Sequence, residues 1–297
     1  MHSQLCEPLQ KQGYQFFSPT SSAAVKPCLW CKAALTMKGM CYKHQFYGIE
    51  SHRCVQMTPT LRCNQRCRFC WRSFEHTLAE EVEYPPDQIL KDIKKLQKRA
   101  LAGYKGSSNV DKERYLEALE PRHVAISLSG EPTCYSKLPE LIELFHKHGF
   151  TTFLVSNGTR PWVLKECKPY QLYISLVAPE RDTYLHLCRP EKDYWDYIQE
   201  SLSLLGKCRS AIRITLVAGW NDKMSDRYAS MILNASPSFV EVKGYMYLGY
   251  SRKRLRKENM PEHHHVRNFS EQIAILSDYQ VVDENPISRV VLLRRIT

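Results

Sequence analysis

Apolar and polar positions follow two different periods along the chain from Val55 onward. Short runs rich in β-branched and aromatic residues predict strands, and longer stretches with apolar residues three or four apart predict helices. The predicted strands are 55–60, 123–129, 151–156, 172–178, 211–218 and 239–246. The predicted helices lie at 85–104, at 138–148, from Pro161 onward, and at 193–205, 223–233 and 262–276.

Strands that alternate with helices of ten or more residues indicate βαβ units and a parallel sheet. Six such units predict an α/β fold, a partial (β/α)6 TIM-like barrel with its ligands at the carboxyl ends of the strands. We expect this barrel to occupy residues 55–297. Residues 26–54 are rich in cysteine and aromatic residues and predict a cap. Residues 1–25 are polar without a clear period and predict a mobile or loosely docked tail.

Composition narrows the class of protein. The chain has 297 residues and contains no apolar run near the length of a membrane span and no signal peptide. Twelve cysteines in such a chain predict reduced thiols and metal ligation in a cytoplasm. Lys and Arg number 42 against 31 Asp and Glu, which gives a net charge of +11. This excess indicates a polyanionic partner such as a nucleic acid, the alternative being a generally basic surface.

Three cysteines in eight residues, Cys63, Cys67 and Cys70, follow the first predicted strand. Three thiolates in one short loop can hold three irons of a 4Fe–4S cluster and leave the fourth iron open, whereas structural zinc takes four ligands. Unrelated core cysteines are the alternative. With Phe69 before the last cysteine, the loop resembles that of the radical S-adenosylmethionine (SAM) enzymes. The resemblance implies cleavage of SAM to methionine and a 5′-deoxyadenosyl radical.

Two further motifs of that superfamily follow predicted strands in the expected order. By resemblance, the Ser129-Gly130-Glu131-Pro132 turn would contact the amino group of SAM, through its backbone and Glu131. The Ser156-Asn157-Gly158-Thr159 turn would approach the ribose or the carboxylate. Ser175 and Arg213, near later strand ends, are weaker candidates, and a surface ion pair is the alternative for Arg213. The candidate SAM-binding residues are therefore Gly130, Glu131, Ser156, Asn157, Ser175 and Arg213.

Cys28, Cys41 and Cys54 recur upstream with twelve residues between successive members. Ahead of a radical SAM loop in a basic chain, they resemble the archaeal-type 4-demethylwyosine synthases of wybutosine biosynthesis, the form without a flavodoxin domain. The resemblance implies a second 4Fe–4S cluster on these three thiols. Cys31 offers an alternative to Cys28, and the pair could also join Cys67 and Cys70 in a zinc site. Equal spacing and the family pattern favour Cys28.

The resemblance also gives Lys43, two residues after Cys41, a role in holding pyruvate. A Schiff base needs a neutral amine, which burial beside positive groups can supply. Chelation of pyruvate by the open iron of the second cluster, with Lys43 assisting, is the alternative.

A basic segment follows the last predicted barrel strand, and five cations in six residues predict contacts to RNA phosphates. Three tyrosines before it could stack on a splayed base, although alternating aromatic residues on a strand more often belong to the core or line the barrel. The candidate RNA-binding residues are Arg252, Lys253, Arg254, Arg256 and Lys257, and the tyrosines are Tyr245, Tyr247 and Tyr250. A solvated basic loop is the alternative.

The implied reaction joins pyruvate to N1-methylguanosine beside the anticodon of tRNA(Phe) and forms 4-demethylwyosine. The 5′-deoxyadenosyl radical would abstract hydrogen from the N1-methyl group, and the carbon radical would add to pyruvate and cleave its C1–C2 bond. An external low-potential donor of the flavodoxin or ferredoxin type would supply electrons, and we expect a cytoplasmic monomer. The alternatives are another radical SAM enzyme with an auxiliary cluster, and a zinc-stabilised RNA-binding protein without catalysis.

Overall fold

A computed structural model describes residues 2–74 and 82–296, with the backbone alone for residues 2–6. The chain forms two compact units. The first comprises Met1–Cys63, Glu75–Val155 and Glu166–Tyr170, and the second comprises Asn64–Phe74, Ser156–Lys165 and Gln171–Thr297. Among the described residues, no helix combines the length and the apolar character that a membrane span requires.

The first unit contains three parallel strands, β3 (Cys54–Thr58), β4 (His123–Ile126) and β5 (Thr151–Ser156, whose last residue belongs to the second unit). Two short antiparallel strands, β2 (Ala24–Val25) and β1 (Gln15–Phe16), extend the sheet beyond β3. Val124, Ile126, Phe153 and Leu154 are fully buried. Runs of apolar residues of this kind are typical of parallel strands covered on both faces.

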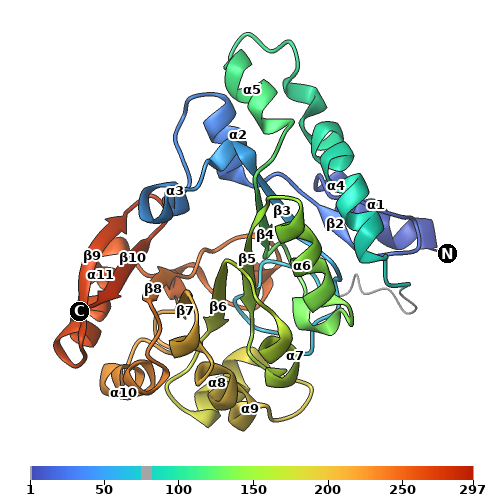
Figure 1. Cartoon of the computed structure of the whole chain (residues 1–297). Coiled ribbons are helices and arrows are strands. Elements are labelled where there is room, and N and C mark those ends of the chain that lie inside the picture. Colours follow the sequence, from blue (N-terminus) through green and yellow to red (C-terminus); the bar gives the residue numbers. More distant parts are fainter. Residues whose placement is uncertain (1, 75–81, 297) are drawn as a thin grey trace. The chain divides into compact units, whose positions relative to one another are not determined.

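Helices of the first unit bury one apolar face each. In α4 (Pro86–Leu101), Ile89, Ile93 and Leu101 are fully buried while lysines occupy the other face. Pro86 stands in the first turn, where its missing N–H costs no hydrogen bond. This helix packs against α6 (Leu138–Lys147) and against β1 and β2 (Figure 1). The remaining elements are α1 (His2–Lys11), α2 (Leu29–Leu35), α3 (Tyr42–Tyr47), α5 (Lys112–Ala118), η1 (Ser51–Arg53), η2 (Ala102–Tyr104) and η3 (Pro132–Cys134).

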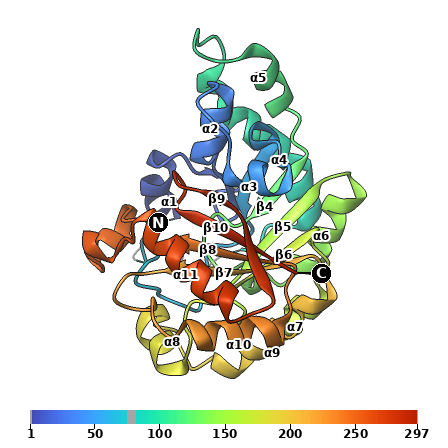
Figure 2. The ribbon, with the colours of Figure 1, turned by 90° about the vertical axis from the view of Figure 1, so that its left-hand side faces the viewer.

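The second unit contains the parallel strands β6 (Gln171–Ser175), β7 (Ser210–Leu216) and β8 (Phe239–Gly244). The antiparallel strands β10 (Val290–Arg295) and β9 (Tyr279–Asn285) continue from β8. Figure 2 shows α11 (His263–Ile275) lying over β8, β9 and β10, which it contacts. The other elements are α7 (Pro161–Glu166, whose last residue belongs to the first unit), α8 (Arg181–Cys188), α9 (Trp195–Leu202), α10 (Ser225–Ala235), η4 (Leu205–Lys207), η5 (Gly249–Lys253) and η6 (Lys257–Asn259).

The N-terminal segment differs from the predicted mobile or loosely docked tail. Residues 2–11 form α1, β2 pairs with β3, and Tyr14 and Ala24 are buried. Two-residue strands have too few positions to give a period, so the sequence pattern missed them. Residues 26–54, for which we predict a cap and not a separate domain, pack against later elements of the first unit, because Cys31 and Leu35 share a hydrophobic cluster with Leu101 and Ala118.

Candidate active site

The Gly-Glu-Pro turn lies against the segment that leads into Cys63. Gly130 has a φ of +76°, and a Cβ there would lie 3.0 Å from the Arg62 carbonyl oxygen and closer still to that of Thr60. The Glu131 N–H donates to the Arg62 carbonyl oxygen at 2.7 Å. Glycine is therefore required by the close approach of two backbones at this turn.

The Glu131 side chain is buried within the same turn. Its carboxylate accepts hydrogen bonds from the backbone N–H of Thr133 at 3.1 Å and from the Thr133 hydroxyl at 2.7 Å. These bonds cap η3 and fix the turn. Glu131 thus acts on the shape of the turn, and a direct contact with SAM stays a prediction.

In the second unit, the Ser156–Thr159 turn holds the residue that follows Cys63. The Asn157 amide donates to the Asn64 side-chain oxygen at 2.9 Å, and the Asn64 amide donates to the Thr159 hydroxyl at 2.8 Å. The Ser156 hydroxyl accepts from the Gly158 N–H within the turn. Asn157 therefore orients the cysteine loop, and Ser156 stabilises the turn itself. The sequence did not predict these two roles.

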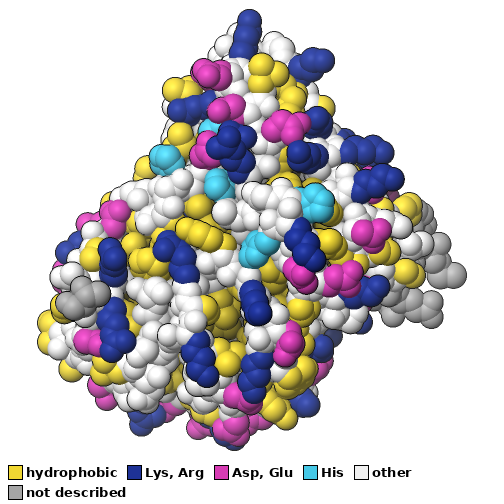
Figure 3. Space-filling view, in the orientation of Figure 1, with side chains coloured by type: hydrophobic (Ala, Val, Ile, Leu, Met, Phe, Trp, Pro, Cys, Tyr) yellow, Lys and Arg dark blue, Asp and Glu magenta, His cyan; other side chains and the backbone are white. Residues whose placement is uncertain are grey.

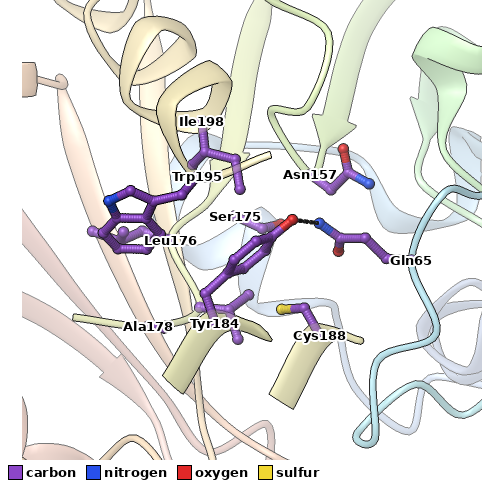
Figure 4. Close-up of a pocket in the computed structure, with 10 residues that line it drawn as sticks. Gln65, Asn157, Ser175, Leu176, Ala178, Tyr184, Cys188, Trp195 and Ile198 are labelled. Carbon is purple, nitrogen blue, oxygen red and sulfur yellow. Dashed lines mark hydrogen bonds between the residues drawn. The ribbon is translucent and has the colours of Figure 1, made fainter. Parts of the chain in front are cut away.

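A small pocket lies beside this turn, and two of the predicted SAM-binding residues, Asn157 and Ser175, line it (Figure 4). Gln65 also lines the pocket and donates to the Tyr184 hydroxyl at 3.1 Å, as the close-up shows. Polar groups of the cysteine loop, the Ser156–Thr159 turn and the end of β6 thus share one pocket. Its apolar lining includes Leu176, Val177, Trp195 and Ile198.

The thiols of Cys67 and Cys70 are buried. A side-chain hydrogen bond with Cys188 and burial raise the pKa of the Cys67 thiol well above its usual range. Burial, and then the neighbouring Cys67, raise the pKa of Cys70. Buried thiolates need a compensating cation, and iron ions would supply one. Three soft donors with this spacing fit a 4Fe–4S cluster.

Arg254 was predicted to bind RNA, but its side chain contacts the cysteine loop instead. Its guanidinium donates to the carbonyl oxygens of Cys67 at 3.0 Å, Cys70 at 2.8 Å and Arg72 at 2.7 Å. A guanidinium bound to three carbonyls of the cysteine loop is not oriented for an RNA phosphate. Arg254 is therefore removed from the predicted RNA-binding set, and nothing in the sequence distinguished it from its basic neighbours.

The other four cations of the segment, Arg252, Lys253, Arg256 and Lys257, are exposed. Arg252 lies 5.5 Å from the Tyr247 ring centre, and Lys253 lies 5.0 Å from that of Tyr250. Tyr245 is buried and donates to the Ser251 hydroxyl, so it is unavailable for stacking on a base. Figure 3 shows Lys and Arg side chains over the face in view, interleaved with Asp and Glu.

Arg213 forms an ion pair, but not at the surface. Its guanidinium donates to one carboxylate oxygen of Glu241 from two nitrogens, at 3.1 and 2.8 Å, and the Glu241 side chain is fully buried. The two residues face each other in register on β7 and β8. Glu241 thus balances the charge of Arg213, which weighs against the predicted contact with the SAM carboxylate.

The three upstream cysteines stand at the starts of three elements in the first unit. Cys28 precedes α2, and its sulfur accepts the N–H of Cys31 at 3.2 Å. Cys41 precedes α3, and Cys54 begins β3. Burial, and then the charges of Cys28 and Cys41, raise the pKa of the Cys54 thiol to about 12. The three thiols are therefore close enough to interact electrostatically.

Lys43 belongs to the same group of residues. Its charge acts against the upward pKa shifts of Cys28 and Cys54, which burial causes. Its amine lies 5.1 Å from the centre of the Phe153 ring. Lys43 thus lies near Cys28 and Cys54 and next to the Phe153 ring.

Cys31 is buried whereas Cys28, Cys41 and Cys54 are half-buried, and Cys28 packs against the same hydrophobic cluster as Cys31. Cys31 is fully buried with Leu35, Leu101 and Ala118, and its thiol donates to the His52 carbonyl oxygen at 3.8 Å. Both cysteines border one apolar cluster, so the choice of Cys28 over Cys31 as the third upstream ligand stays a prediction.

Comparison with known proteins identifies the family. A radical SAM superfamily model matches residues 57–231, and a model for wyosine base formation matches residues 234–295. The chain is 45% identical to the S-adenosyl-L-methionine-dependent tRNA 4-demethylwyosine synthase of Pyrococcus abyssi, over 99% of this chain and 90% of that protein. It is 42% identical to the synthase of Methanocaldococcus jannaschii, over 96% and 94%. The chain belongs to the tRNA 4-demethylwyosine synthase family.

Solved structures of the family agree with the fold. A structure of TYW1 with a lysine–pyruvate adduct bound superposes with a TM-score of 0.90 at 40% identity, over 98% of this chain and 95% of that one. Archaeal TYW1 gives a TM-score of 0.82 at 36% identity, over 98% and 95%. The predicted radical SAM fold, an α/β partial barrel, is therefore confirmed. So is the resemblance to 4-demethylwyosine synthases on which the sequence analysis relied.

Proposed function

We propose that this protein condenses pyruvate with N1-methylguanosine beside the anticodon of tRNA(Phe) to form 4-demethylwyosine, as a radical SAM lyase. The observation that carries the proposal is the position of Lys43 among the upstream thiols. The chain is 40% identical to a TYW1 whose structure contains a lysine–pyruvate adduct. Lys43 is accordingly the lysine that we expect to hold pyruvate.

Cys63, Cys67 and Cys70 would hold one 4Fe–4S cluster. When bound, this cluster supplies the electron that cleaves SAM to methionine and the 5′-deoxyadenosyl radical. The backbone at Gly130 would fix the methionine end of SAM, because the turn packs directly on the chain before Cys63. Asn157 and Ser175 would contact SAM from the small pocket that they line, which has polar and apolar walls.

Cys28, Cys41 and Cys54 would hold a second 4Fe–4S cluster near Lys43. The buried thiols need cationic compensation here as well. Lys43 attacks the ketone carbon of pyruvate only as a free amine, and the imine forms with loss of water. The Lys43 amine lies over the face of the Phe153 ring at 5.1 Å, which places it against an apolar wall of the first unit. Binding of pyruvate by the second cluster, with Lys43 assisting, is the competing arrangement.

The target nucleotide must leave the stack before its methyl group can be reached. Arg252, Lys253, Arg256 and Lys257 are exposed and would neutralise tRNA phosphates. The cations over Tyr247 and Tyr250 leave those rings less suited to hold the base. An external low-potential protein of the flavodoxin or ferredoxin type would deliver electrons, and the reaction is expected in the cytoplasm, on a monomer.

The experiment is an anaerobic incubation with SAM, pyruvate, a reductant and tRNA that carries N1-methylguanosine. Nucleosides from the digested tRNA are then analysed by mass spectrometry. We expect 4-demethylwyosine, and none when pyruvate or SAM is omitted. Brown protein with about eight irons is expected before the reaction. Colourless protein that contains zinc and leaves the nucleoside unchanged would contradict the proposal.

A further inference from the structure

The basic segment of the second unit is fastened to the chain just after the cysteine loop. Gly249 has a φ of +55°, and a Cβ there would lie 3.3 Å from the Trp71 carbonyl carbon and closer still to its oxygen. The N–H of Tyr250 donates to the same carbonyl oxygen at 2.9 Å. The start of η5 therefore cannot move without moving Trp71.

Arg254 completes this attachment from the end of η5. Besides the carbonyls of Cys67, Cys70 and Arg72, its guanidinium donates to the Tyr250 carbonyl oxygen at 3.2 Å. It also lies 4.1 Å from the centre of the Phe74 ring. A guanidinium has five N–H donors in one rigid plane, which suits several acceptors and a flat ring at once.

Two of the four carbonyls that meet at Arg254 belong to cysteines of the loop, Cys67 and Cys70. The same loop contains a turn in which the Cys70 N–H donates to the Cys67 carbonyl oxygen at 3.1 Å. Carbonyl groups brought to one cation repel each other when that cation is removed. The turn that sets the separation of the two thiols therefore depends on the guanidinium.

We propose that Arg254 is a positioning residue that holds Cys67 and Cys70 in the geometry for iron binding. Through η5 it connects this loop to the exposed cations Arg252 and Lys253. The assignment of the loop to iron rests on the proposed function, whereas the bracing of the loop by Arg254 does not. The described hydrogen bonds include none from Arg252 or Lys253 to a carbonyl of the loop, so these two residues serve as matched controls.

The charge of Arg254 adds a second consequence. A cluster becomes more negative when it is reduced, and a fixed positive charge nearby favours the reduced form. Loss of the guanidinium charge is therefore expected to make the reduction potential of the bound cluster more negative. Arg254→Lys keeps one positive charge but cannot reach four acceptors, so it separates geometry from charge.

The first test uses metal-free protein and hydrogen exchange of backbone amides in residues 64–74. The variants are Arg254→Lys and Arg254→Gln, with Lys253→Gln as the control. Loss of three charge-assisted hydrogen bonds predicts exchange at least about tenfold faster at Arg68 and Cys70 in both Arg254 variants. We expect wild-type exchange in Lys253→Gln. Wild-type exchange in the Arg254 variants, or faster exchange that extends to β4 and β5, would overturn the proposal.

The second test uses the reconstituted protein and two readouts. The cluster whose electron paramagnetic resonance spectrum changes on addition of SAM is titrated for its reduction potential. We expect a more negative potential in Arg254→Gln than in Arg254→Lys. Salt titration of tRNA affinity should give Arg254→Gln the wild-type slope, and Lys253→Gln a slope smaller by about 0.7–0.9. The reverse pattern would make Arg254 a phosphate contact. If the reconstituted wild-type protein binds no iron, the proposed function is refuted. The hydrogen-exchange test on metal-free protein would still decide whether Arg254 stabilises the loop.

Discussion

Cys28, Cys41 and Cys54 come from the starts of α2, α3 and β3, whereas Cys63, Cys67 and Cys70 come from one loop of eight residues. The upstream thiols are brought together by the packing of the first unit. The loop gains its shape from local turns and from hydrogen bonds with Arg254 and the end of α8. A site assembled from distant elements depends on the fold around it. A site within one loop depends on the hydrogen bonds that hold the loop in shape.

The two sets also differ in the residue beside them. Lys43 lies near the upstream thiols, where an amine can act on a carbonyl compound. The loop instead neighbours the small pocket that Asn157 and Ser175 line, beside the predicted SAM-binding turns. The comparison therefore predicts separate duties, with SAM cleavage at the loop and pyruvate binding at the upstream set.

The largest effect is expected from replacing Cys63, Cys67 and Cys70 together with Ala. SAM cleavage should be abolished and the iron content should fall to roughly half of two 4Fe–4S clusters. Cys208→Ala, at an exposed cysteine of the second unit, is the control and should keep both properties. SAM cleavage that persists in the triple variant would contradict the assignment of the loop.

Replacing Cys28, Cys41 and Cys54 with Ala should abolish formation of the modified nucleoside and also remove roughly half of the iron. Some SAM cleavage should remain, uncoupled from product, because the loop and its pocket are intact. Cys31→Ala is the matched control, which should keep its iron and lose about 1 kcal/mol of unfolding free energy from the buried cluster. Full iron content in the upstream triple variant would refute the second cluster.

Lys43→Ala should keep both clusters and SAM cleavage but lose condensation with pyruvate. Lys43→Arg should fail in the same way, because a guanidinium stays protonated and forms no imine. Borohydride with labelled pyruvate should label the wild type alone. Label that persists in Lys43→Ala would assign the imine to another lysine, and no label in either protein would favour binding of pyruvate by the second cluster.

The smallest of these effects concerns tRNA affinity. Replacing Arg252 and Lys253 with Gln should weaken binding and lower the slope of log affinity against log salt by roughly 0.7–0.9 for each lost phosphate contact. SAM cleavage without tRNA should stay at the wild-type rate, because these side chains do not touch the loop. An unchanged slope would mean that the segment is a solvated surface and that the basic charge contacts RNA elsewhere.

Much of the fold could be predicted because each barrel strand is an apolar run bounded by turns. The predicted strand 151–156 coincides with β5, and the predicted helix 262–276 lies within one residue of α11 at each end. Most of the elements missed have weak patterns, but β10 was also missed although its run Val290–Leu293 is apolar and buried. β9 alternates little and carries several polar residues. The seven-residue α5 depends on Asp111, whose side chain accepts the N–H of Arg114.

The candidate site was predictable where its spacing is short and not where it depends on packing. The loop cysteines were evident from their spacing, but Cys28 and Cys41 were chosen by family resemblance. The roles of Asn64 and Arg254 follow from contacts with residues far away in the sequence, at separations of 93 to 187 positions. A single sequence contains no signal for such contacts, since Arg254 looks the same as its basic neighbours.

The central claim is that SAM is cleaved at the cysteine loop, and that the upstream cysteines are needed for condensation with pyruvate but not for SAM cleavage. Its most direct measurement is the ratio of 5′-deoxyadenosine released to 4-demethylwyosine formed, in wild type and in the upstream triple variant, with tRNA and pyruvate present. The account predicts comparable amounts of the two products in wild type, and 5′-deoxyadenosine without the modified nucleoside in the variant. Continued formation of 4-demethylwyosine without Cys28, Cys41 and Cys54 would contradict it.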